Sequence, residues 1–318
     1  MRNRIFDLLK IGTSLGLLLL LLWKVGWRET WATLRGSDFR YLLAAWGLYL
    51  FSMVIRAYRW QVLLRIQNLS APLSRLVSLY FTGTFFNTVL PTGFGGDVVR
   101  MYELSKHSGH GTESIGTVLV DRLTGFLVLF AMASLALIFS YRLIPPVITA
   151  IIIVITVASM VTVWMALNKT VWKGLQRLPL LGWLLQRKRV QEFYVSIQAY
   201  RTYAIYKALL ASLAFNVLLM VFNYLIALAL GVRISIWYFL VFIPIISFLL
   251  TLPVSVSGLG VREGGYVLLF AQAGVPHALA LAMSLCVYVL TVITGLVGGL
   301  LYVLQGYKGL GEKRDPRE

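Results

Sequence analysis

Two similar phrases, each with an arginine at or near its end, break an otherwise apolar chain. The first runs from Leu90 to Arg100 (LPTGFGGDVVR) and the second from Leu252 to Glu263 (LPVSVSGLGVRE). Aligned on their prolines, the phrases share a leucine, a proline, a glycine, a valine and an arginine. A glycine turn that leads into a helix exposes backbone N–H groups at the positive end of the helix dipole. With an arginine beside them, these groups form a site that binds an anion.

In the first phrase, Gly95 and Gly96 let the backbone turn, and residues 98–106 are predicted to form a short helix. Asp97 is placed as the N-cap of that helix, and Arg100 lies in its first turn. We expect these residues to contribute to an anion site. The alternative is that Asp97 only caps the helix while Arg100 extends to the membrane interface.

The second phrase combines helix breakers with hydroxyl groups. These residues are Ser255, Ser257, Gly258 and Gly260. Arg262 and Glu263 begin the returning helix, and we expect them to have separate partners because adjacent helical residues do not face one another. A charge at the centre of a membrane span costs roughly 2.5–3.5 kcal/mol, so these charges require a compensating role. A structural ion pair between this hairpin and the bundle is the alternative to ligand binding.

A third charged pair, Asp121-Arg122, lies about two turns into the apolar run that begins at Ser114. Charges at this depth are expected to face the interior of a helix bundle. We expect Asp121 to pair with Arg100, and Arg122 with Asp97. The result would be a mixed-charge cluster beside the first phrase, and a salt bridge that only locks helices together is the equal alternative.

Membrane helices must position these residues. Of the 318 residues, 59% are hydrophobic and 13% are charged, and the mean hydropathy is +0.81, as expected of an integral membrane protein. About 20 apolar residues cross the hydrocarbon core. We predict six full spans, at residues 5–23, 41–55, 114–139, 146–167, 208–230 and 277–304. Two further apolar stretches, residues 76–90 and 236–252, lead directly into the two phrases.

The basic residues orient these spans, because cytoplasmic loops carry an excess of lysine and arginine. The loop after residue 167, the C-terminal tail and the N-terminus are all predicted to be cytoplasmic. Residues 76–100 must then enter and leave from the inside, and residues 236–273 from the outside. The predicted fold is an all-α polytopic membrane protein with two oppositely oriented re-entrant helical hairpins that form an inverted repeat. Two corresponding interrupted segments of this kind indicate the binding site of a transporter.

We expect one integral membrane domain over residues 1–318. Its parts are a peripheral N-terminal helix and link (1–40), a first inverted-repeat unit (41–140), a connecting span and basic cytoplasmic loop (141–207), a second inverted-repeat unit (208–304) and a cytoplasmic tail (305–318). The net charge of +17 suits anionic lipid better than nucleic acid, because the basic residues lie mostly on loops. Cys286 is expected to be inert packing.

The remaining polar residues have plainer expected roles. Residues 56–60 (RAYRW) are expected to anchor a helix end at the membrane interface. Asn87, Asn216 and Asn223 are expected to hold helices together. The sequence has no motif of an ATPase, serine hydrolase or zinc protease, and we expect neither a metal site nor a cofactor.

The chain resembles the lysylphosphatidylglycerol synthase transmembrane-region family, also called flippase-like integral membrane proteins. The resemblance covers residues 33–304 and rests on residues 59–60 (RW), 87–91 (NTVLP), 95–100 (GGDVVR), 121–123 (DRL) and 258–264 (GLGVREG). Some members of this family add a soluble aminoacyl-transferase domain, which we do not expect here, nor do we expect an enzyme. The family's second motif often reads Pro-Gly-Gly-x-Gly, whereas residues 255–257 here are Ser-Val-Ser.

The resemblance implies a lipid flippase-like transporter that moves an anionic or phosphate-headed lipid between the leaflets of the cell membrane. Both phospholipids and polyprenyl phosphates fit this class. The expected head-group ligands are Arg100, Arg122, Arg262, Gly95, Gly96, Ser255, Ser257, Gly258 and Gly260. Asp97, Asp121 and Glu263 are expected to balance the arginines or to accept a proton.

Two other functions compete with transport. The first is a non-catalytic membrane scaffold or accessory subunit for a lipid-modifying enzyme or a glycosyltransferase, with the basic loop as the docking segment. The second is a membrane-embedded transferase that acts on a polyprenyl carrier. That transferase would need carboxylates at one mouth, for which the candidates are Asp97, Glu103 and Asp121.

Overall fold

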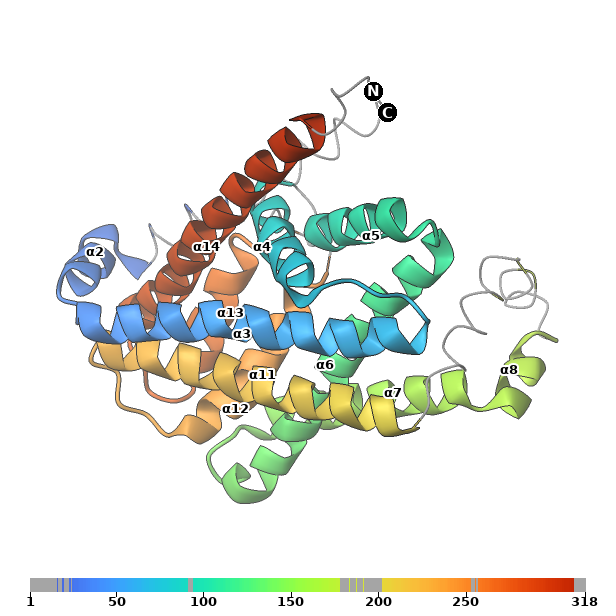
Figure 1. Cartoon of the computed structure of the whole chain (residues 1–318). Coiled ribbons are helices and arrows are strands. Elements are labelled where there is room, and N and C mark those ends of the chain that lie inside the picture. Colours follow the sequence, from blue (N-terminus) through green and yellow to red (C-terminus); the bar gives the residue numbers. More distant parts are fainter. Residues whose placement is uncertain are drawn as a thin grey trace.

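The computed structural model describes residues 25–90, 94–177, 202–252 and 257–311, and the single positions 16, 19, 23, 183, 187, 191 and 255. Within these ranges every regular element is a helix, as predicted (Figure 1). The helices are α2 (Trp27–Arg35), α3 (Phe39–Ile66), α4 (Leu73–Val89), α5 (Gly95–Ser108), α6 (Gly111–Ser140), α7 (Pro146–Leu167), α8 (Lys169–Leu175), α11 (Thr202–Ala229), α12 (Ile236–Leu249), α13 (Val261–Ala271) and α14 (His277–Gly311).

Four helices in the described ranges are long and apolar enough to cross a membrane. They cover Phe39–Ile66, Gly111–Ser140, Ile205–Ala229 and His277–Leu304. Four of the six predicted spans thus coincide with such a helix, and the chain has the composition of a multi-pass membrane protein. Pro146–Thr162 and Ile236–Leu249 form shorter apolar helices. The predicted span at residues 5–23 lies outside the described residues, apart from three single positions.

Helix α3 continues eleven residues past the predicted end of its span at residue 55 and ends at Ile66. The basic residues after position 55 therefore lie inside the helix and not at its end. Arg59 is only 3% exposed and Trp60 is fully buried, so the prediction that residues 56–60 anchor a helix end at the interface is wrong. The physical reason is that Arg59 pairs with a carboxylate inside the bundle and has no need to reach water.

Both Pro/Gly phrases interrupt the helices, as predicted. The first hairpin consists of α4 and α5, and the second of α12 and α13; the two helices of each hairpin contact each other. The turn before α13 requires positive φ angles, which are +75° at Gly258 and +80° at Gly260. Glycine adopts such angles without steric cost, which explains why the second phrase breaks the chain at this point.

The first hairpin differs from its prediction at the start of the short helix. Helix α5 begins at Gly95, not at residue 98, and the N-cap position belongs to Phe94. The glycines therefore form the first turn of the helix itself. The prediction that Asp97 is the N-cap is wrong, because the earlier start places Asp97 inside the first turn, where its carboxylate pairs with arginines.

The helices before and after the α7–α8 segment make corresponding contacts. Helix α3 packs along α11 (Figure 1), α4 packs on α14, and α12 packs on α6. In the same way, α5 contacts α6 as α13 contacts α14, and α3 contacts α4 as α11 contacts α12. These pairs correspond when α3, α4, α5 and α6 are matched in order with α11, α12, α13 and α14. The α3–α11 contact then joins two helices that are matched with each other.

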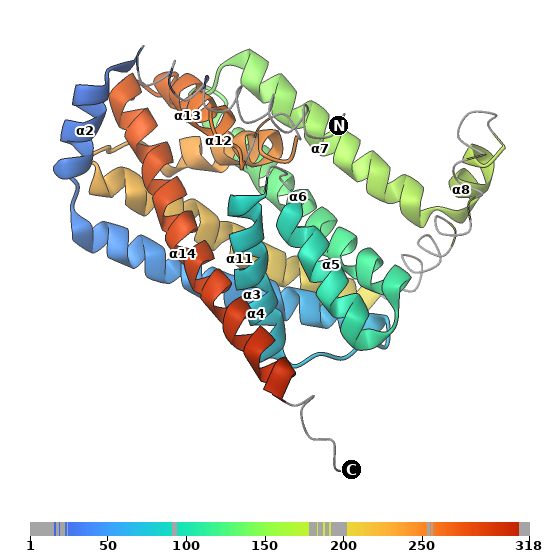
Figure 2. The ribbon, with the colours of Figure 1, turned by 90° about the horizontal axis from the view of Figure 1, so that it is seen from above.

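The first hairpin is fixed to α14 by a close backbone approach between α4 and α14 (Figure 2). A Cβ atom added at Gly298 of α14 would lie 2.0 Å from the carbonyl oxygen of Phe81 in α4. Gly295 and Gly299 approach the same helix at Phe85. Small residues allow membrane helices to approach closely and to gain van der Waals contact, so this glycine face sets the position of α4.

We expect Gly298→Ala to push α4 away from α14 and to lower the thermal unfolding midpoint of the purified protein in detergent. The expected loss is about 1–3 kcal/mol, as for other overpacked contacts. The matched control is Gly47→Ala in α3, where an added Cβ meets no atom within 4 Å. The control should be neutral or slightly stabilising, because alanine favours a helix over glycine. Equal midpoints for both variants would contradict the close approach.

Candidate functional site

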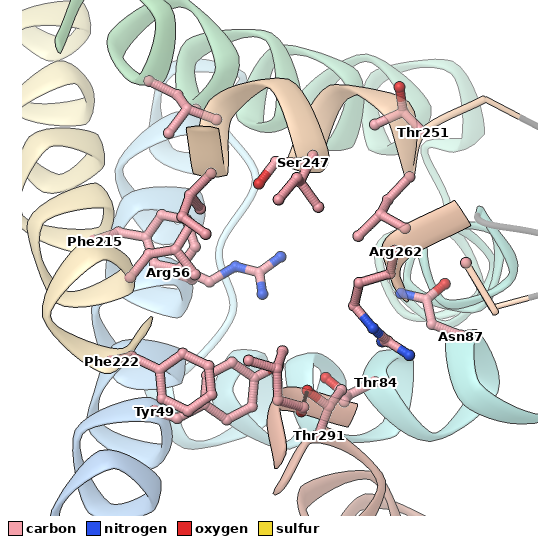
Figure 3. A pocket seen from close by; sticks show the side chains of 18 of the residues that line it. Tyr49, Arg56, Thr84, Asn87, Phe215, Phe222, Ser247, Thr251, Arg262 and Thr291 are labelled. Atoms are coloured by element: carbon pink, nitrogen blue, oxygen red, sulfur yellow. Dashed lines mark hydrogen bonds between the residues drawn. The ribbon is translucent and has the colours of Figure 1, made fainter. Parts of the chain in front are cut away.

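A cavity of about 360 Å³ lies among the two hairpins and the helices α3, α6, α11 and α14. Five arginines line it, namely Arg56, Arg59, Arg100, Arg122 and Arg262, together with the carboxylates Asp97 and Asp121. In Figure 3, Arg56 and Arg262 extend into the same hollow from opposite sides. The remaining wall is largely apolar and is formed by residues such as Phe126, Leu129, Leu219, Phe222, Ile243 and Ile246. The cavity therefore combines several arginines with apolar side chains on its wall.

Asp121 of α6 lies at the centre of a buried ion-pair network. Its Oδ1 accepts a hydrogen bond from Arg59 Nε at 2.7 Å, and its Oδ2 accepts one from Arg100 Nη2 at 3.2 Å. The hydroxyl of Tyr80 also donates to Oδ2. Asp121 is 1% exposed, and Arg59 and Arg100 are each 3% exposed. This single carboxylate therefore connects α3, α5 and α6 inside the bundle.

Asp97 of α5 extends the network towards the cavity. Its carboxylate accepts a hydrogen bond from Arg100 Nη1 at 3.1 Å and lies 3.2 Å from Arg122 Nε. Both predicted pairs, Arg100 with Asp121 and Arg122 with Asp97, are thus present. The alternative in which Arg100 extends to the membrane interface is excluded by its burial.

Aromatic rings hold the guanidinium groups that the carboxylates do not fully satisfy. The Cζ atom of Arg100 lies 3.8 Å from the ring centroid of Tyr80 and 4.2 Å from that of Trp60. The Cζ atom of Arg56 lies 4.7 Å from the Tyr80 ring and 5.0 Å from the Phe215 ring. Such cation–π contacts are strongest where water is excluded. This applies to Arg100, which is 3% exposed.

In the second hairpin, Glu263 of α13 is completely buried and pairs with its neighbour. Its Oε2 accepts a hydrogen bond from the backbone N–H of Gly260 at 2.6 Å, and its Oε1 accepts one from Arg262 Nη2 at 2.8 Å. The prediction that Arg262 and Glu263 have separate partners is wrong. In the first turn of a helix, a glutamate reaches back to the free backbone N–H groups, and this brings its carboxylate beside the Arg262 guanidinium.

The hydroxyl group of Ser257 joins the second hairpin to the first. The Oγ of Ser257 lies 2.9 Å from the carbonyl oxygens of both Asn87 and Thr88, at the end of α4. The side-chain oxygen of Asn87 in turn accepts a hydrogen bond from the backbone N–H of Gly96 at 2.7 Å. Asn87 therefore holds the first hairpin closed, and Ser257 holds the second hairpin against it.

The structure brings five of the nine predicted head-group ligands to the cavity wall. These are Arg100, Arg122, Arg262, Ser257 and Gly258. The N–H groups of Gly96 and Gly260, which the sequence suggests for anion binding, donate instead to side chains of this chain. Gly95 packs beside Leu90, and Ser255 is buried but does not line the cavity.

The three asparagines occupy interhelical positions, as predicted, and all of them also line the cavity. Asn216 of α11 donates to the carbonyl oxygen of Gly125 in α6 at 3.2 Å. Asn223 of α11 accepts a hydrogen bond from the hydroxyl of Tyr266 in α13. They therefore connect α11 to the elements that carry the charged residues.

Arg56 and Arg59 are the cavity residues that the sequence analysis missed. A signal was available, because the two arginines are three residues apart and so share a helix face. The apolar run Val62–Leu64 that follows them also shows that the helix continues. Among the described residues, no group of three or more His, Cys, Asp or Glu side chains is placed to hold a metal ion.

Comparison with known proteins gives two matches. The family described as the lysylphosphatidylglycerol synthase TM region matches residues 8–299. A protein of Pyrococcus horikoshii, described as a UPF0104 membrane protein, is 29% identical over 136 residues. That match covers 42% of this chain and 40% of the archaeal protein, so it spans less than half of either chain.

We expect Asp121→Asn to leave the guanidinium groups of Arg59 and Arg100 buried without a full counter-charge. Removal of one partner of a buried pair costs about 3–5 kcal/mol, so the thermal unfolding midpoint in detergent should fall steeply. The matched control is Asp38→Asn, an exposed N-cap of α3 where asparagine caps equally well. Adding Arg59→Leu to Asp121→Asn should restore part of the loss. Equal midpoints for Asp121→Asn and Asp38→Asn would refute the network.

Proposed function

We propose that this chain, which belongs to the lysylphosphatidylglycerol synthase TM-region family, moves a phosphate-headed anionic lipid between the two leaflets of a membrane. The observation that carries the proposal is the arginine-lined cavity between the two hairpins. The family match and the four candidate spans show a multi-pass membrane protein of this family.

The chemistry of the cavity suits a phosphate group that leaves water. A charged head group loses its hydration shell when it passes through hydrocarbon, and other donors must replace that shell. Guanidinium groups do so well, because each offers several N–H donors in a planar fork that matches phosphate oxygens. Arg100, Arg122 and Arg262 come from α5, α6 and α13 and line the same cavity.

The apolar wall supports a lipid in preference to a soluble anion. Phe222 and Leu219 of α11 and Ile243 of α12 line the same cavity as the arginines. A cavity lined by both arginines and apolar side chains can hold a head group together with the first part of its hydrocarbon chain. The rest of the chain can then stay in the surrounding lipid.

We further propose that the two hairpins are re-entrant and that residues 41–140 and 208–304 form an inverted repeat. The corresponding contacts of α3–α6 and α11–α14 support this arrangement, as do the shared phrases in the two hairpins. In transporters with such repeats, one repeat or bundle moves against the other around a fixed site. The proposed location is the cell membrane, with both chain ends in the cytoplasm.

We expect Arg262→Ala to slow lipid movement by about tenfold or more, the effect of one lost charge-assisted hydrogen bond to the head group. The assay measures the loss of fluorescence of acyl-labelled phosphatidic acid and phosphatidylglycerol in proteoliposomes when a membrane-impermeant reductant is added. The matched control is Arg142→Ala, because Arg142 is exposed, lies outside the cavity and donates its Nε–H to the hydroxyl of Tyr141.

Folding of each variant is checked by size-exclusion chromatography in detergent before reconstitution. Lipid movement by the natural protein no faster than in empty vesicles would refute the proposal. So would equal rates for Arg262→Ala and Arg142→Ala in folded protein.

A further inference from the structure

The charges around the cavity do not balance among the described residues. The guanidinium groups belong to Arg56, Arg59, Arg100, Arg122 and Arg262, and the carboxylates that contact them belong to Asp97, Asp121 and Glu263. Asp97 and Asp121 each serve two arginines, and Glu263 serves one. Because arginine stays protonated in proteins, the described cavity carries a surplus of two positive charges.

Arg56 is the clearest source of this surplus. No carboxylate of the described residues lies within ion-pair distance of it. Its Nε is buried without a hydrogen-bond partner, and its Nη1 reaches only the sulfur of Met53 at 3.9 Å. The rings of Tyr80 and Phe215 hold the guanidinium by cation–π contact instead of by a counter-ion.

The ring contacts fix the orientation of the Arg56 guanidinium but do not neutralise its charge, so it can still pair with an anion. The close view shows its guanidinium extending into the open centre of the cavity, facing the side from which Arg262 enters (Figure 3). Arg100, whose guanidinium also lies over the Tyr80 ring, likewise has a buried Nε without a hydrogen-bond partner. A ligand with one negative charge would leave part of the surplus uncompensated, and an uncompensated buried charge is strongly unfavourable.

We propose that the head group carries two negative charges on one phosphate, as a phosphate monoester does, and that Arg56 distinguishes it from a singly charged phosphodiester. This inference rests on the proposed function, because it names the substrate class of the same cavity. Near neutral pH a monoester has three terminal oxygens and a charge close to −2. A diester has two free oxygens and a charge of −1, and it therefore leaves one guanidinium without a partner.

The test compares two lipids that share the same acyl chains and differ only in the ester. Phosphatidic acid is the monoester, and phosphatidylmethanol is the diester with the smallest added group. Acyl-labelled forms of both are followed in proteoliposomes at pH 8, where the monoester is doubly charged. We expect the natural protein to move phosphatidic acid about tenfold faster, the effect of one additional charge-assisted hydrogen bond. With Arg56→Gln the ratio of the two rates should fall to about one, whereas Arg142→Gln should keep it.

Binding to the purified protein in detergent separates the failure of this inference from failure of the proposed function. Each lipid, and inorganic phosphate as the soluble source of the same group, is added separately and the thermal unfolding midpoint is measured. A larger shift with phosphatidic acid than with phosphatidylmethanol, lost in Arg56→Gln, supports the inference even if no lipid moves. Equal shifts or equal transport rates for the two lipids overturn it while transport itself stands.

Stabilisation by inorganic phosphate without any by phosphatidic acid would overturn the assignment to a lipid head group. If Arg56→Gln does not fold, Arg56→Lys takes its place, because lysine keeps the charge and loses the planar fork. The comparison of the two lipids on the natural protein tests the preference for a doubly charged head group without any variant, and the Arg56 variant tests the role of that arginine.

Discussion

One carboxylate, that of Asp121, holds the guanidinium groups of Arg59 and Arg100 inside the helix bundle. In a membrane neither group has water beside it, so the position of Asp121 determines where α3, α5 and α6 can meet. The start of α5 follows from this meeting point, because Arg100 and Asp97 lie on its first turns. The cavity lies where it does because these charges must converge, and the apolar helices enclose them.

The ion pairs around the first hairpin were predictable from the sequence. The full length of α3 was not. Asp97, Arg100, Asp121 and Arg122 are charges in apolar surroundings, and few partners are available to satisfy them. Arg59 instead follows a long apolar run, where a basic residue usually marks the interface. Its true role depends on Asp121, which lies 62 residues further along the chain, and local patterns do not report such a contact. The pairing of Arg262 with Glu263 was missed because helix-surface geometry does not apply in a first turn.

The arginines around the cavity outnumber the carboxylates, and this excess links the helix packing to the proposed binding of an anion. A bundle that needed only stability would pair each buried arginine with one carboxylate or replace both by apolar residues. Here two carboxylates are shared among three arginines, and rings hold Arg56 in place of a counter-ion. The energetic cost of this arrangement is offset if a negatively charged ligand completes it. The same ligand then stabilises the helices that surround it, and occupancy is coupled to the packing of both hairpins.

The backbone contact between Gly298 and Phe81 has a consequence for motion. Helix α4 cannot slide over α14 without first separating from it, so the first hairpin and α14 must travel together. On the other side, ring contacts join α12 to α6, through Phe248 with Phe130 and Trp237 with Phe139. The contacts therefore join the hairpin of each half of the chain to the last long helix of the other half. Because α3–α6 and α11–α14 are interlocked in this way, neither set of helices can leave the other without breaking these contacts.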